Sequence, residues 1–214
     1  MKADQFFSEE EKGRIRECVR RAEAQTSGEI VPMVIERSAD YTGTRLMAAI
    51  AGALLAACIW LIARPLLHPL WLIVAEGVGF SAILFLLRIS PGLLRLMIDK
   101  SVIEDAVRHR ARLAFFDHGL YRTRDRTGVL ILISLLERRV HILADEGINQ
   151  KVPQSTWDNL VQHLTGGIQR GEAASALCET IEICGQILAE HFPRRPDDRD
   201  ELGDQVITGG SPLS

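Results

Sequence analysis

Residues 46–63 read LMAAIAGALLAACIWLIA, a stretch of eighteen residues without a charged side chain. Residues 65–87 read PLLHPLWLIVAEGVGFSAILFLL and are interrupted only by His68, Pro69 and Glu76. A helix rises about 1.5 Å per residue, so each stretch is long enough to cross the hydrocarbon layer of a bilayer, which is about 30 Å thick. Only a few residues around Arg64 separate the two stretches. The sequence therefore predicts a transmembrane helical hairpin with spans at 46–63 and 66–87.

Basic residues near the two spans predict the orientation of this hairpin. The basic residues outside the connecting loop are Arg37 and Arg45 before the first span, and Arg88, Arg95 and Lys100 after the second. The loop itself carries Arg64 alone. Because lysine and arginine near membrane ends favour the cytoplasmic side, we expect a multi-pass protein of the cell (inner) membrane with both termini in the cytoplasm.

The cysteines and the net charge exclude further classes of protein. The four cysteines, Cys18, Cys58, Cys178 and Cys184, show neither a Cys-x-x-Cys motif nor the spacing of metal ligands. We therefore expect unpaired thiols, which agrees with a reducing cytoplasm. A net charge of −3 argues against binding of nucleic acid.

The segments on either side of the hairpin read as alternating helices and strands. Ser8 and Glu11 form a capping-box pattern that starts a helix over 9–25. Strands are expected at 29–36, 129–135 and 140–144, where Pro32 favours an edge or a bulge in the first of them. Helices are expected over 93–118, with a restart at Ser101, from 153 onward and over 172–191. The residues from 193 to 214 are rich in Pro, Asp, Arg and Gly and predict a disordered tail.

The strand at 29–36 has too few neighbours before the hairpin to form a core of its own. We expect it to pair with 129–135, so that residues 1–45 and 88–192 build one small α/β domain with the hairpin, 46–87, inserted in a crossover connection.

Three stretches resemble the TPM domain family. They are SGEIV at 27–31, TGVLILISLLERRV at 127–140 and DEGI at 145–148, the last followed by Val152-Pro153. The resemblance implies an α/β/α sandwich and, in some members, calcium binding or an acid phosphatase activity. The chain departs from the family pattern at Arg126-Thr127, where many members have an acidic or amide pair, and at Gln154, where Asp is common.

The acids near these motifs are the candidate metal ligands. Asp145 and Glu146 follow a strand, and Asp117 and Asp125 lie in the preceding loop region. Calcium takes six to eight oxygen ligands, so the four acids together are a candidate calcium site. The alternative is that Asp145 and Glu146 form a solvated turn.

Glu76 is unusual because a carboxylate within a bilayer is costly unless it is protonated, paired or placed near the surface. Gly77 and Gly79 beside it permit close helix packing. We interpret these three residues as a candidate membrane contact, with either another membrane protein or a second copy of this chain.

The sequence thus favours an integral membrane protein whose TPM-like cytoplasmic domain serves as an interaction, assembly or accessory module at the bilayer surface. The alternative is a calcium-dependent, phosphatase-like hydrolase.

Overall fold

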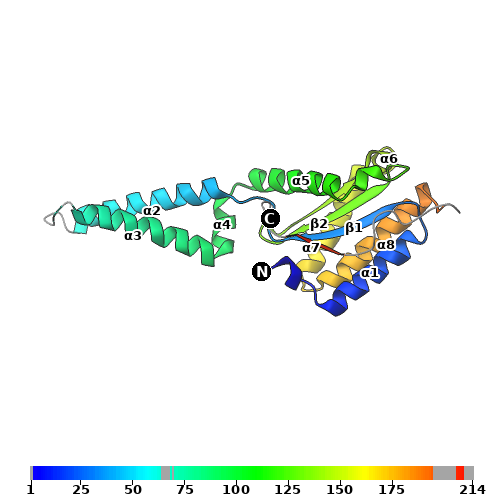
Figure 1. The fold of residues 1–214 in the computed structure, drawn as a ribbon, viewed down its shortest axis with the longest axis horizontal. Helices are drawn as coiled ribbons and strands as arrows, with labels where there is room; N and C mark the ends of the chain where they lie inside the picture. Colours follow the sequence, from blue (N-terminus) through cyan, green and yellow to red (C-terminus); the bar gives the residue numbers. More distant parts are fainter. Residues whose placement is uncertain (1, 64–67, 69, 195–205, 210–214) are drawn as a thin grey trace. The chain divides into compact units, whose positions relative to one another are not determined.

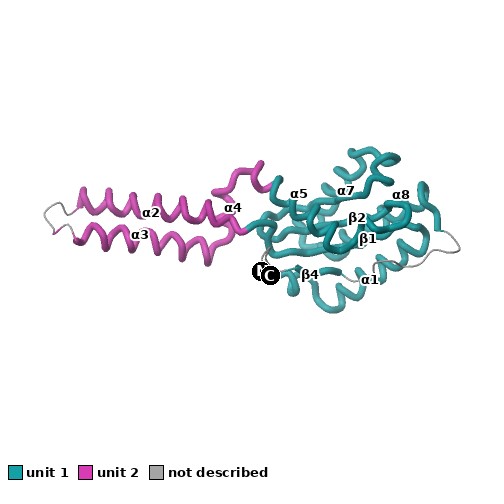
Figure 2. Tube along the Cα trace, turned by 45° about the horizontal axis from the view of Figure 1, so that its top comes forward, with its two compact units in different colours: residues 1–39, 104–214 teal, residues 40–103 magenta. Residues whose placement is uncertain are grey.

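The computed structural model describes residues 2–63, 68, 70–194 and 206–209. Contacts divide the chain into two compact units (Figure 2). One unit consists of residues 1–39 and 104–214, and the other of residues 40–103. Residues 66, 67 and 69 of the predicted second span lie outside the described residues.

The first unit is built on a four-stranded sheet with the order β3-β2-β1-β4. The strands are β1 (Glu29–Ile35), β2 (Gly128–Ser134), β3 (Arg139–Ala144) and β4 (Ile207–Gly209). β1 and β2 pair in parallel, with Glu29 opposite Gly128, and β3 pairs antiparallel to β2. The predicted pairing of the two flanks across the insertion is therefore confirmed, as is the β2–β3 hairpin.

Helices cover both faces of this sheet (Figure 1). Every residue of β1 and β2 is buried, as expected for strands enclosed on two sides. Ile30, Val34 and Ile131 face a core formed with α1 (Glu9–Glu23), α7 (Gln154–Gln169) and α8 (Ala173–His191). The opposite face is covered by α5 (Lys100–Asp117). The predicted α/β/α sandwich is confirmed.

The first strand is not an edge strand along its whole length, because β4 continues the sheet beside it. β4 pairs with Met33–Ile35 only, so Pro32 lies just before the point where β1 gains its second neighbour. Proline lacks an N–H, which this position does not require. Within the predicted tail, 207–209 form β4, because the free edge of β1 gives this short segment backbone partners. Residues 195–205 and 210–214 lie outside the described part of the chain.

The predicted helix starts are confirmed at one position and corrected at another. Ser8 and Glu11 form the capping box of α1, with Ser8 Oγ accepting from Glu11 N at 3.2 Å. The expected bend separates α4 (Pro91–Met97) from α5. α5 is started by Asp99, whose Oδ1 accepts from the backbone N–H of Ser101 at 3.3 Å, and not by Ser101 itself. The short elements are η1 (Ala3–Gln5), η2 (Leu120–Arg122) and α6 (Glu146–Asn149).

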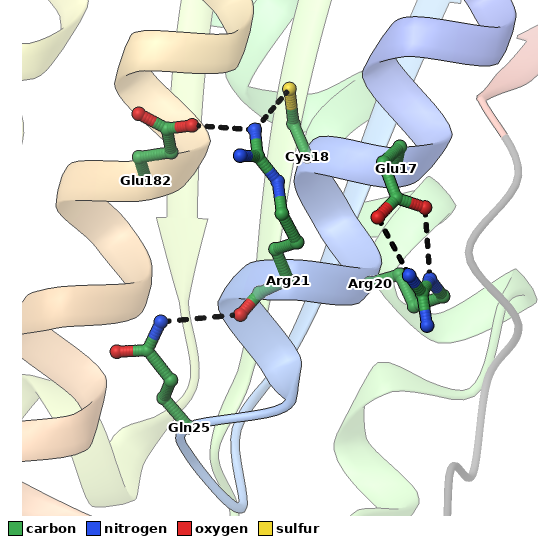
Figure 3. A network of polar contacts seen from close by, with 6 residues as sticks. All are labelled: Glu17, Cys18, Arg20, Arg21, Gln25 and Glu182. Carbon is green, nitrogen blue, oxygen red and sulfur yellow. Dashed lines mark hydrogen bonds and ion pairs between the residues drawn. The ribbon is translucent and has the colours of Figure 1, made fainter.

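In the structure, two of the four cysteines that were expected to be unpaired form a disulfide. Cys18 of α1 and Cys178 of α8 form a disulfide although they are 160 positions apart in the sequence. Arg21 lies beside this pair and joins the two helices: its Nη2 contacts Glu182 Oε1 at 2.9 Å and Cys18 Sγ at 3.6 Å (Figure 3). Sequence spacing gave no hint of this pair, because only the packing of α1 on α8 brings the two sulfurs together. Cys184 is a buried thiol, and burial raises its pKa to about 12.

The second unit consists mainly of two long apolar helices, α2 (Thr42–Ala63) and α3 (Leu70–Ile89), both long and apolar enough to span a membrane. Glycines bring them close together. A Cβ on Gly79 would lie 2.6 Å from both Ala56 Cβ and the carbonyl oxygen of Gly52, and a Cβ on Gly52 would collide with Ile83. The contact between α2 and α3 therefore depends on small residues, as is typical of helices packed in lipid.

Candidate functional site

Three loops meet at one edge of the sheet in the first unit. β1 and β2 begin there, and the antiparallel β3 ends there, because Glu29 pairs with Gly128 and Val129 with Ala144. The register thus brings together Ser27-Gly28, the segment 123–127 and Asp145. These are the same loops that carry the three motifs of the sequence.

Asp145 is the most buried acid of this edge, with 6% of its surface exposed. It is the N-cap of α6, and its Oδ1 accepts from Glu146 N at 2.7 Å. Its Oδ2 lies 3.2 Å from Arg126 Nε, in an ion pair whose geometry is not that of an aligned hydrogen bond. Both carboxylate oxygens are therefore committed inside the chain, and Asp145 is not part of a solvated turn.

Arg126 is held on the opposite side of this pair. Its backbone has a φ of +57°, in the left-handed region. Its amide N–H donates to Thr123 O at 3.1 Å, and its Nη1 donates to Tyr121 O at 3.2 Å. The guanidinium is thus fixed by the loop that precedes β2.

Glycines allow the loops to approach one another at this edge. A Cβ on Gly147 would lie 2.6 Å from the carbonyl oxygen of Asp125 and 2.7 Å from that of Arg126. A Cβ on Gly128 would lie 2.6 Å from the carbonyl oxygen of Leu120. The glycines of the second and third motifs are therefore needed for close packing of the loop before β2.

Comparison with known proteins finds a family model that matches part of the chain. Residues 95–187 match the model of the TPM domain. The chain carries a TPM domain. This name is used below for the first unit, which holds most of the matched residues. The solved structures include a similar fold, the NMR structure of the BA42 protein from the psychrophilic bacterium Bizionia argentinensis, with a TM-score of 0.61 and 23% sequence identity over 96% of this chain and 97% of that chain. A search of curated proteins gives no match.

The four acids predicted as calcium ligands differ in their surroundings. Glu146 and Asp117 are exposed, and Asp125 is half-buried in the loop before β2. No group of three or more His, Cys, Asp or Glu side chains suited to a metal occurs among the described residues. Calcium takes six to eight oxygens, and the buried carboxylate of Asp145 faces an arginine.

An open pocket of about 430 Å³ adjoins this edge, lined by Ser27, Asp125, Lys151, His191 and Arg194 among others. Lys151 Nζ donates to the carbonyl oxygen of His191 at 3.1 Å and lies 4.1 Å above the ring of Phe192. Lys151 thus also holds the end of α8 against the loop after α6.

The opposite edge of the sheet carries a polar cluster that sequence reasoning missed. Glu137, in the turn after β2, is buried, and its carboxylate accepts from Ser134 Oγ at 2.5 Å and from Ser38 N at 2.9 Å. The two serine hydroxyls are 2.9 Å apart. The cluster fixes the chain where β1 ends, just before the second unit begins. A charged residue in a Glu-Arg-Arg turn gives no sequence signal of burial.

The three candidate membrane residues lie differently on α3. Gly79 packs against α2, as described above. Gly77 faces away, because a Cβ placed on it meets nothing within 4 Å. Glu76 is half-buried and lies about 9 Å along the helix from Leu70.

Proposed function

We propose that this protein is an integral membrane protein in which α2 and α3 form a transmembrane hairpin and the TPM domain binds a partner protein at the membrane surface. The observation that carries the proposal is the exposure of α2 and α3. In the most apolar 18-residue window of each helix, only 11% and 6% of the residues are buried. Ile62, for example, is 84% exposed. A surface of this kind is stable in lipid and costly in water.

The residues at the ends of the two helices support the same proposal. Trp60 and Trp71 lie near the connection between α2 and α3, where aromatic side chains favour the membrane interface. At the other end, α4 exposes Leu93, Leu96 and Met97 beside Arg95. A short helix with apolar and basic side chains suits the boundary between lipid and water.

We place both termini on the cytoplasmic side of the cell (inner) membrane, because arginines and Lys100 concentrate at the chain ends of the hairpin. The disulfide between Cys18 and Cys178 argues in the other direction, since disulfides are rare in the cytosol. Under the proposed orientation the cellular thiol pool keeps this pair reduced, and the bond closes only under oxidising conditions.

The intramembrane partner is proposed to be another membrane protein or a second copy of this chain. The face of α3 that carries Gly77 supports this. α2 does not contact Gly77, and the absence of a side chain there lets another helix approach closely. Gly79, which packs inside the helix pair, is left out of this contact.

Reporter fusions and membrane extraction test the proposal. We expect the protein to stay in the membrane pellet after alkaline carbonate washing. A C-terminal green fluorescent protein should fluoresce, and a C-terminal alkaline phosphatase should be inactive. Release by carbonate would contradict the membrane hairpin, and the reverse reporter pattern would contradict the orientation. Crosslinking in the native membrane, with Gly77→Leu as the variant and Gly43→Leu as the control, would identify the partner contact.

A further inference from the structure

Arg126 has a backbone conformation that is unfavourable for arginine. A φ of +57° is adopted readily by Gly and more easily by Asn or Asp than by a long side chain. The arginine is kept there by the contacts of its side chain, to the carbonyl oxygen of Tyr121 and to the carboxylate of Asp145. The contacts of the guanidinium, and not the backbone conformation, therefore explain why an arginine stands at this position.

Asp145 requires a positive charge nearby. It is 6% exposed, and the single hydrogen bond found for its carboxylate is the cap of α6 on Oδ1. Its Oδ2 faces Arg126 Nε at 3.2 Å. A carboxylate removed from water is costly unless a cation or hydrogen-bond donors replace the lost hydration.

We propose that the guanidinium of Arg126 takes the place of a divalent cation at this edge of the TPM domain. The positive charge that a bound calcium ion would bring is then a permanent part of the chain, and the loops before β2 and after β3 are held together without a metal. A second cation beside Asp145 would be repelled by the guanidinium, and the exposed Glu146 and Asp117 supply no further buried oxygen. This inference is independent of the membrane proposal.

The test compares unfolding temperatures of the full-length chain in detergent, with EDTA or with millimolar calcium chloride. The wild type should unfold at the same temperature in both. Arg126→Asn should unfold about 5 to 10 °C lower in both, because it leaves a buried carboxylate without its cation. Arg126→Asp should be unstable in EDTA and recover with calcium, and titration calorimetry with calcium chloride should give binding heat for this variant alone.

Arg138→Asn is the matched control. Arg138 also has a left-handed backbone, with a φ of +50°, but lies in the exposed turn between β2 and β3. Its replacement should leave the unfolding temperature unchanged or raise it. Calcium stabilisation of the wild type that disappears in Asp145→Asn would overturn the proposal. So would an Arg126→Asn variant as stable as the wild type, or an Arg126→Asp variant that calcium does not stabilise. If Arg126→Asp does not fold, the unfolding temperatures of the wild type and of Arg126→Asn still test the proposal.

Discussion

At each of these two edges of the sheet, one buried acid is held by contacts with neighbouring residues. At one edge, Asp145 caps a helix and faces Arg126, so its charge is neutralised within the chain. At the other, Glu137 is buried and accepts hydrogen bonds from the hydroxyl of Ser134 and the backbone N–H of Ser38. In both cases an acid that is expected to be solvated is buried in the fold. Contacts that include residues from other segments offset the free energy of removing its carboxylate from water.

His141 is a partly buried titratable residue, and it makes stability depend on pH. It lies in β3, and burial, followed by the charges of Arg108 and Arg112 on α5, lowers its pKa. The unfolded chain, in which histidine has a pKa of about 6.5, therefore binds the proton more readily than the folded chain. The free energy of unfolding should fall as the pH drops below about 6.5 and level off below the lowered pKa of the folded state.

Chemical denaturation of the full chain in detergent between pH 7.5 and 5 measures this dependence. His141→Gln should flatten it, because the group that titrates is gone. Arg108→Gln should weaken it by removing one repelling charge. A His141→Gln variant with an unchanged pH profile would show that other groups are responsible.

At the scale of the element, the two long apolar helices differ from the helices of the TPM domain in how they pack. α1 and α8 are joined by large apolar side chains, by the disulfide and by the Arg21–Glu182 ion pair. α2 and α3 instead approach through Gly52, Ala56 and Gly79. Inside a bilayer the lipid is as apolar as the helices, so close contact of small residues replaces the hydrophobic effect as the source of association.

Valine at Gly79 should separate α2 from α3, whereas valine at Gly77 should not. The first substitution places side-chain atoms where Ala56 and the carbonyl of Gly52 already lie, at a cost of about 1–3 kcal/mol. The second meets no atom of the chain within 4 Å. Hydrogen exchange followed by mass spectrometry in one detergent should show faster exchange in α2 for Gly79→Val only. Equal exchange in both variants would contradict the assigned contact.

At the scale of the whole molecule, the insertion separates two strands that pair side by side. Residues 40–103 form a compact unit of their own within the connection between β1 and β2. The TPM domain is therefore completed only after the second unit has been synthesised, because β2 follows it in the chain. During synthesis, α2 and α3 therefore become available for membrane insertion before the TPM domain can finish folding.

Under the proposed membrane topology, the state of Cys18 and Cys178 reports on which side of the membrane the TPM domain lies. We expect both to be thiols in growing cells and a disulfide in protein purified in air. Cells carrying Cys58→Ser and Cys184→Ser would be quenched with acid and labelled with a maleimide polymer under denaturing conditions. Two added polymer chains per molecule are expected. A molecule that is labelled only after reduction would place the domain in an oxidising compartment and contradict the proposed orientation.

The sequence by itself determined the two apolar spans, the capping box of α1, and the pairing of 29–36 with 129–135. The spans and the capping box depend on side chains within a few helical turns, so they can be read from the local sequence. The strand pairing was predicted because 29–36 has no nearer segment with which to form a core. It also predicted the four acids of a calcium site, but not that Arg126 faces Asp145.

Only the tertiary structure decided the ion pair of Arg126, the disulfide of Cys18 with Cys178, the burial of Glu137 and the added strand β4. Each depends on distances between segments that are far apart in the chain, and those distances are set by the strand register and by helix packing. The type of a charged, thiol or backbone group does not indicate which distant residue it will contact. The fold supplies that partner, and at Asp145 it supplies an arginine.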